Sequence, residues 1–87
     1  MYYVYILLLK NGQHYTDYAK DLTIRVSEHK RGKVKSTAKR LPVKLIYYEA
    51  YLLKSDAQRR ERFLKTTEGK RLLRMQLRDL LKKVRVN

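Results

Sequence analysis

The sequence predicts an α+β domain with a small, mainly antiparallel three-stranded sheet and three helices. Two kinds of pattern support this fold class. Residues 2–9 and 43–52 are rich in tyrosine and in aliphatic or β-branched side chains, which is typical of strands. Segments beginning near residues 21, 55 and 67 combine a capping residue with apolar side chains at helical spacing. The predicted order of elements is β-β-α-β-α-α.

The first two strands, residues 2–9 and 13–18, are joined by an Asn-Gly pair that favours a hairpin. A two-residue loop would place Tyr5 and Tyr15 on opposite faces of the sheet. A three-residue loop closed by Gly12 in the left-handed conformation would bring four side chains to one face. These are Tyr5, Leu7, Tyr15 and Asp17. The residues alone leave both loop lengths open.

The first helix is expected over residues 21–31, with Asp21 as its N-cap and Gly32 as its terminator. One face carries residues at i, i+3, i+4 and i+7 spacing: Leu22, Arg25, Val26 and His29. After this helix, residues 33–42 have no periodicity and form a predicted basic loop.

Two more helices follow the third strand. Ser55 and Gln58 have the spacing of a capping box, so a helix is predicted to begin at Ser55. Its inward face carries Glu61, which lies among arginines. Thr67 is expected to cap a third helix that runs to about Val84, with leucines along one side.

The composition excludes several classes of protein. Eighty-seven residues allow one domain, here residues 1–87. The absence of cysteine excludes a disulfide scaffold, a cysteine-ligated zinc site and thiol catalysis. No apolar run approaches the roughly 20 residues of a membrane span, so we expect a soluble, cytoplasmic protein with no membrane partner. A net charge of +14, from 22 basic and 8 acidic residues, favours nucleic acid as the partner.

Hydrolysis of a phosphodiester requires a base for water, a cation that neutralises charge on the phosphate, and usually a metal ion. The predicted fold supplies tyrosines on the hairpin, Arg25 and His29 on the first helix, and Glu61 on the second. One carboxylate can hold a Mg²⁺ ion that keeps most of its waters. Nearby positive charge favours the ionised form of a tyrosine, which is the form that acts as a base.

The order and spacing of these residues resemble a GIY-YIG nuclease domain. The matching segments are Tyr3-Val4-Tyr5 and Tyr15-Thr16-Asp17, followed by Arg25, His29 and Glu61. Among the members of this superfamily, the chain looks most like the small single-domain YhbQ-like (UPF0213-type) group. The resemblance covers nearly the whole chain.

The resemblance implies a role for each matching residue. Tyr5 would help to position water or phosphate, Tyr15 would be the general base, and Arg25 would bind the scissile phosphate. His29 would be a proton-transfer partner that assists Tyr15. Glu61 would ligate a single Mg²⁺ or Mn²⁺ ion. The family also places its two motif tyrosines together, which favours the three-residue hairpin loop.

Two motif positions depart from the family pattern, because Tyr3 and Asp17 each stand where the motifs have glycine. Tyr3 is a substitution common in the small members. The Asp17 carboxylate adds bulk and negative charge beside the expected phosphate. Asp17 is therefore interpreted as an exposed strand residue, a second metal ligand, or a substitution that silences the enzyme.

The expected function is that of a metal-dependent DNA endonuclease with weak sequence specificity or selectivity for DNA structure, acting in DNA repair or processing. DNA is favoured over RNA as its partner. The alternative is a non-catalytic nucleic-acid-binding module of the same fold, silenced by Asp17. In either case the cations of the basic loop would contact phosphates. These cations are Lys33, Lys35, Lys39 and Arg40.

Overall fold

The computed structural model describes residues 1–86, so the last residue of the expected 1–87 domain lies outside it. An antiparallel sheet has the order β2-β1-β3, which confirms the predicted α+β class. The strands are β1 (Tyr2–Leu8), β2 (His14–Ala19) and β3 (Lys44–Tyr51). The helices are α1 (Leu22–Lys30), α2 (Lys54–Leu64), α3 (Thr67–Gln76) and α4 (Arg78–Val86), with a short 3₁₀ helix, η1 (Ala38–Arg40), in the basic loop.

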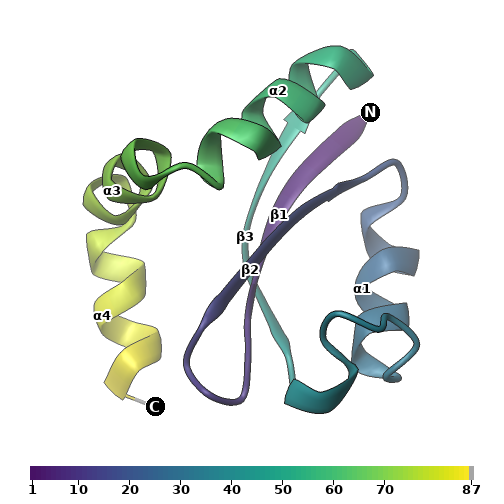
Figure 1. Ribbon diagram of the computed structural model, residues 1–87, viewed down its shortest axis with the longest axis vertical. Helices are drawn as coiled ribbons and strands as arrows, with labels where there is room; N and C mark the ends of the chain where they lie inside the picture. Colours follow the sequence, from purple (N-terminus) through teal and green to yellow (C-terminus); the bar gives the residue numbers. More distant parts are fainter. Residues whose placement is uncertain (87) are drawn as a thin grey trace.

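The helices cover different parts of the sheet. Figure 1 shows α1 on one side of the strands, α3 and α4 on the other, and α2 near the end of the sheet where the N-terminus lies. None of the helices in the described part of the chain has both the length and the apolar character needed to cross a bilayer.

The hairpin between β1 and β2 has the three-residue loop. Gly12 has a φ of +84°, and the Leu9 amide donates to the Gln13 carbonyl at 2.8 Å. The left-handed conformation explains the glycine, because a side chain there would be strained. In this register Tyr5 lies opposite Asp17, and Leu7 lies opposite Tyr15. All four therefore share the face that α1 covers.

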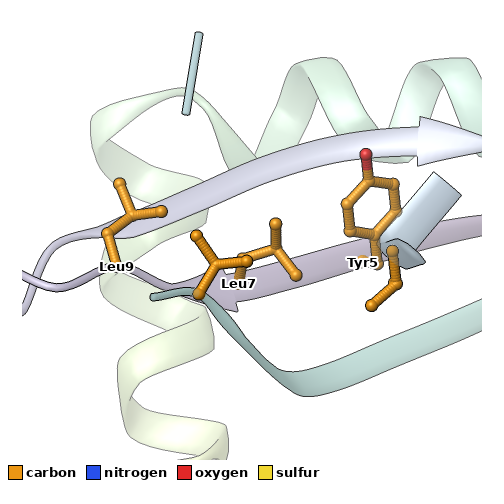
Figure 2. Close-up of a cluster of buried hydrophobic side chains, with 5 residues drawn as sticks. Tyr5, Leu7 and Leu9 are labelled. Carbon is orange, nitrogen blue, oxygen red and sulfur yellow. The ribbon is translucent and has the colours of Figure 1, made fainter. Parts of the chain in front are cut away.

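Each face of the sheet has its own core. On the α1 face, Tyr5, Leu7 and Leu9 lie in a row (Figure 2) and pack with Val26 and Val43. On the other face, Val4 packs with Ala57 and Leu64, and Ile6 is also buried. Alternation along β1 thus supplies two cores, and both stabilise the sheet by removing apolar area from water.

Both ends of α1 follow the prediction. The Asp21 carboxylate accepts a hydrogen bond from the Ile24 amide at 3.0 Å. Gly32, at a φ of +73°, ends the helix and donates its amide to the His29 carbonyl at 3.0 Å. These two caps fix the length of α1.

The predicted capping box at Ser55 and Gln58 is wrong. α2 begins one residue earlier, at Lys54, and its N-cap Leu53 provides no side-chain hydrogen bond. Gln58 instead donates from Nε2 to the Tyr18 hydroxyl at 3.0 Å. A tertiary contact with β2 therefore replaces the local contact that the sequence predicts.

The prediction of one long helix from Thr67 to Val84 is also wrong. Thr66 is the N-cap and accepts from the Gly69 amide at 3.0 Å. The helix breaks at Leu77, which has φ −104° and ψ 24°, and Arg78 donates to the Met75 carbonyl at 3.2 Å. Figure 1 shows that α4 runs at an angle to α3. Leu73, Leu77 and Leu81 all line a cavity of about 570 Å³ against the sheet.

A charged hydrogen-bond cluster lies where β3 meets α2. The Glu49 carboxylate accepts hydrogen bonds from Tyr47 at 2.6 Å, from Tyr51 at 2.5 Å, and from Nε and Nη2 of Arg60 at 2.9 and 3.0 Å. Burial alone would raise the pKa of Glu49, but these hydrogen bonds hold it below its ordinary value. Burial and the Glu49 contact raise the pKa values of both tyrosines to about 12.

We predict that Glu49→Gln destabilises the fold by roughly 1.5–3 kcal/mol, because several hydrogen bonds lose their charged acceptor. The folded protein binds a proton at Glu49 less readily than the unfolded chain. This stabilisation is therefore present above the ordinary pKa of 4.5 and is lost as the pH falls through the lower folded value. Denaturant unfolding of both proteins at neutral and acidic pH measures it.

The matched control is Glu68→Gln, which removes an exposed ion pair with Arg71. Such pairs contribute about 0–1 kcal/mol. An equal loss in the two variants, or a Glu49→Gln deficit that does not shrink in acid, would contradict the prediction.

Candidate nuclease site

A chain of buried hydrogen bonds joins β1, α1 and the basic loop. The Tyr5 hydroxyl lies 2.8 Å from Nε2 of His29, and Nδ1 of His29 lies 2.8 Å from Oγ1 of Thr37. All three residues are fully buried, with 0% of their surface exposed. The Thr37 hydroxyl also reaches the Val34 carbonyl, at 3.5 Å.

The partners in this chain determine its proton positions. The Arg25 guanidinium lies beside the Tyr5 hydroxyl and can only donate hydrogen bonds. With Arg25 as a donor, we assign the Tyr5 proton to Nε2 of His29. The proton of the neutral imidazole is then on Nδ1 and is donated to Thr37, which in turn donates to the Val34 carbonyl.

The electrostatics agree with a neutral histidine. Burial, followed by the positive charge of Arg25, lowers the pKa of His29. Burial and the negative charge of Asp17 raise the pKa of Tyr5 well above its ordinary value, although Arg25 opposes this effect. The buried, hydrogen-bonded side chains of Tyr5, His29 and Thr37 are thus uncharged at neutral pH.

A second cluster lies nearer the surface on β2. The Tyr15 hydroxyl donates to Oδ2 of Asp17 at 3.0 Å and accepts from the Ser36 hydroxyl at 3.0 Å. The other carboxylate oxygen of Asp17 accepts from the Tyr18 amide at 2.8 Å. Burial raises the pKa of Tyr15, Asp17 adds to this effect, and Ser36 opposes it. Asp17 is therefore half-buried within the site and is not a free surface residue.

Arg25 borders both clusters. Its side chain is 36% exposed, and its Nη1 donates to Glu28 at 3.3 Å. Burial would lower the pKa of Arg25, but contacts with Tyr5 and Glu28 and the charge of Asp17 raise it. A guanidinium in this position is half open to solvent, so it can reach a phosphate without leaving the site.

Glu61 points inward from α2, as predicted, and its side chain is 12% exposed. Its carboxylate binds the Lys65 ammonium at 2.5 Å. The contact with Glu61, assisted by the negative charge of Asp17, raises the pKa of Lys65. Lys65, at the end of α2, is thus within the electrostatic field of the β2 cluster.

The Glu61 carboxylate fits a divalent cation, because it already holds a cationic group in a largely buried position. The described residues contain no cluster of three or more histidine, aspartate or glutamate side chains that would hold a metal ion. A metal ion on Glu61 would therefore keep most of its waters, as Mg²⁺ usually does.

The structure brings Tyr5, Arg25 and His29 together, but it pairs His29 differently from the expectation. The histidine is hydrogen-bonded to Tyr5, whereas Tyr15 contacts it only through the edges of their rings, with centroids 5.3 Å apart. The reason is geometric: Tyr5 lies on the central strand directly under α1, and Tyr15 lies on the edge strand.

The sequence analysis missed three residues of the site: Ser36, Thr37 and Lys65. Ser36 and Thr37 lie in the loop without periodicity, where no pattern indicates which side chains turn inward. Lys65 follows Glu61 at i, i+4 spacing. Its spacing does predict that pair, but its attraction to Asp17 depends on the tertiary fold.

The basic loop has two kinds of cation. Lys33, Lys35 and Lys39 are exposed. Arg40 is half-buried and holds the loop together, since its guanidinium donates to the Ser36 carbonyl and, at 3.3 Å, to Oε1 of Gln13. The three lysines are thus available to a partner, whereas Arg40 is engaged within the protein.

The comparisons with known proteins identify the family of the chain. Residues 1–74 match the model of the GIY-YIG catalytic domain. UPF0213 proteins of Staphylococcus aureus strains Mu50 and N315 are each 44% identical over 75 residues, which is 85% of this chain and 92% of theirs. The solution NMR structure of the UPF0213 protein BH0048 from Bacillus halodurans is 38% identical, with a TM-score of 0.53, and covers 84% of this chain and 82% of that one. The chain belongs to the GIY-YIG catalytic domain family and to its UPF0213 group.

Proposed function

We propose that the protein is a metal-dependent endonuclease that hydrolyses phosphodiester bonds in DNA with weak sequence specificity. The observation that carries this proposal is that Asp17, which accepts the Tyr15 proton, has cations of both neighbouring helices in its field. One is the partly exposed Arg25 of α1, and the other is Lys65, the partner of the inward carboxylate of Glu61 on α2. Membership of the GIY-YIG family supports the proposal, and DNA repair or processing is the context that we infer.

Each group has a task that its position supports. Arg25 binds the scissile phosphate and neutralises charge that develops on its oxygens. Tyr15 is the phenol that a water molecule can reach, and it takes a proton from that water. Glu61 would hold Mg²⁺ or Mn²⁺, which supplies Lewis-acid stabilisation of the phosphate when it is bound. The buried hydrogen bonds among Tyr5, His29 and Thr37 fix the position of α1, and therefore of Arg25, relative to the sheet.

Two cationic surfaces flank this site. One is formed by the exposed loop lysines, Lys33, Lys35 and Lys39. The other is a cleft of about 820 Å³ between α1 and the sheet, lined by Lys20, Lys30 and Arg31 together with Tyr3 and Tyr48. Cations spread in this way read the phosphate backbone and the shape of DNA more than its sequence.

We predict that Glu61→Gln lowers the cleavage rate by roughly 100-fold or more while DNA affinity changes little. Glutamine keeps the shape of the side chain but removes the charge that holds the metal ion. A roughly 100-fold lower rate corresponds to a loss of about 3 kcal/mol of transition-state stabilisation. Cleavage of labelled duplex, nicked and branched DNA with Mg²⁺, with Mn²⁺ and with chelator measures the effect. Titration with Mn²⁺ alone should show weaker binding to the variant.

The control is Glu68→Gln, which removes an exposed carboxylate of α3 and should cut like the wild type. A contaminating nuclease would be equally active in every preparation, so a loss confined to Glu61→Gln assigns the cleavage to the protein itself. Full activity of a folded Glu61→Gln protein would refute the metal assignment.

A second prediction concerns the loop lysines. Replacing Lys33, Lys35 and Lys39 together by alanine should weaken DNA binding similarly for all sequences, and it should reduce the slope of log affinity against log salt by about 3. Arg40→Ala should instead lower stability, because its guanidinium holds Ser36 and Gln13. An unchanged salt slope in the triple variant would exclude the loop from the interface.

A second candidate function is a nucleic-acid-binding module without turnover. One observation favours it: the Asp17 carboxylate occupies the site and binds the Tyr15 hydroxyl, where the family motif has glycine. Such a module would bind DNA in a salt-dependent way without metal-dependent cutting, and Asp17→Gly would restore cleavage.

A further inference from the structure

Asp17 is positioned as a hydrogen-bond acceptor for Tyr15. Its Oδ2 accepts the Tyr15 phenol proton at 3.0 Å, while its Oδ1 is held by the Tyr18 amide at 2.8 Å. The carboxylate is thus fixed by the backbone of its own strand. The Tyr15 oxygen also accepts from Ser36 at 3.0 Å, and a phenol oxygen with two lone pairs retains one for a water molecule.

Burial separates the two tyrosines of the site. Tyr5 and His29 are both 0% exposed, and the Tyr5 hydroxyl is already hydrogen-bonded to the histidine. A water that attacks a bound phosphate therefore meets Tyr15, which is only half-buried. However, burial and the contact with Asp17 raise the pKa of Tyr15, so very little phenolate exists at neutral pH. Tyr15 needs another group that takes its proton.

We propose that Asp17 is that group and that Tyr15 and Asp17 act as a proton relay in the hydrolysis inferred above. The inference rests on the proposed function. As the water oxygen forms its bond to phosphorus, one water proton passes to the Tyr15 oxygen, and the phenol proton passes to Oδ2 of Asp17. The bond from phosphorus to the leaving sugar oxygen breaks, and that oxygen takes a proton from solvent. Asp17 later releases its proton to solvent, so protons and charge balance.

The surrounding charges are consistent with a carboxylate at this position. Asp17 raises the pKa values of both Arg25 and Lys65, which shows that two cations lie within its field. These cations reduce the repulsion between Asp17 and a phosphate. Arg25 remains half exposed and able to bind the phosphate itself.

The test is Asp17→Asn, because asparagine keeps the size of the side chain and can accept the Tyr15 hydrogen bond but cannot take up its proton. We expect the cleavage rate at saturating DNA to fall by about 100-fold or more, the usual effect of losing a general base. DNA affinity should stay the same or increase, since one negative charge is removed. Asp56→Asn removes an equal charge from the exposed start of α2 and should cut like the wild type.

A double-variant cycle shows whether Asp17 acts through Tyr15. Tyr15→Phe should be as slow as Asp17→Asn, and the double variant should be no slower than either, because the two residues form one relay. Additive losses would overturn the inference. NMR titration of Tyr15 gives a readout that does not depend on activity. Ser36 and Lys65 also act on the Tyr15 pKa and are unchanged in the variant, so Asp17→Asn should lower this pKa. An unchanged Tyr15 pKa would refute the coupling between Tyr15 and Asp17.

The remaining outcomes separate this inference from the proposed function. If the wild type cuts and Asp17→Asn or Asp17→Gly cuts as well or better, the relay is refuted and endonuclease activity stands. If the wild type does not cut any substrate but Asp17→Gly does, the silenced module is correct and the relay is refuted. If neither protein cuts, the proposed function fails and the relay fails with it.

Discussion

The hydrogen bond between the Tyr5 hydroxyl and His29 is the contact on which the rest of the site depends. It joins the central strand to α1 inside the core, where an unpaired polar group costs about 1–3 kcal/mol. This cost is avoided only if both ring nitrogens of His29 are hydrogen-bonded, so His29 also requires the Thr37 hydroxyl at its other nitrogen. That requirement places the basic loop against α1 and brings Ser36, the residue before Thr37, to the Tyr15 hydroxyl. One buried contact therefore positions both the inner layer of the site, which is the Tyr5–His29–Thr37 hydrogen bonds, and the outer layer around Tyr15.

The two layers differ in what they can do. The inner layer is uncharged and closed to water, so its role is to hold α1 and the basic loop in place against the sheet. The outer layer contains Tyr15, Asp17, Arg25 and the Glu61–Lys65 pair, and it includes every charged group of the site that a phosphate can approach. A rigid interior that supports a polar, partly exposed edge is the arrangement that keeps reactive groups aligned without further reorganisation.

Much of this could be predicted from sequence because it depends on local periodicity. Helical spacing placed Arg25 and His29 on the buried face of α1 and turned Glu61 inward. The hairpin register needed one further fact, the positive φ of Gly12, because a slip by one residue reverses every side chain of β2. The start of α2 and the inward turn of Thr37 follow from tertiary contacts, and the apolar stripe of residues 67–84 does not mark the break at Leu77. No local pattern contains them.

In the proposed site, a strongly basic protein would place the Asp17 carboxylate beside a phosphate. In a chain with a net charge of +14, the long-range field favours DNA strongly, so one negative charge in the site reduces affinity only slightly. Its local effect is much larger, because Arg25 and Lys65 lie close and the surroundings are partly buried. In the function that we propose, the cost of Asp17 would therefore be spread over the whole DNA interface, whereas its benefit as a proton acceptor would be confined to Tyr15. This difference in range would make a substitution that weakens the approach of a phosphate compatible with a working site.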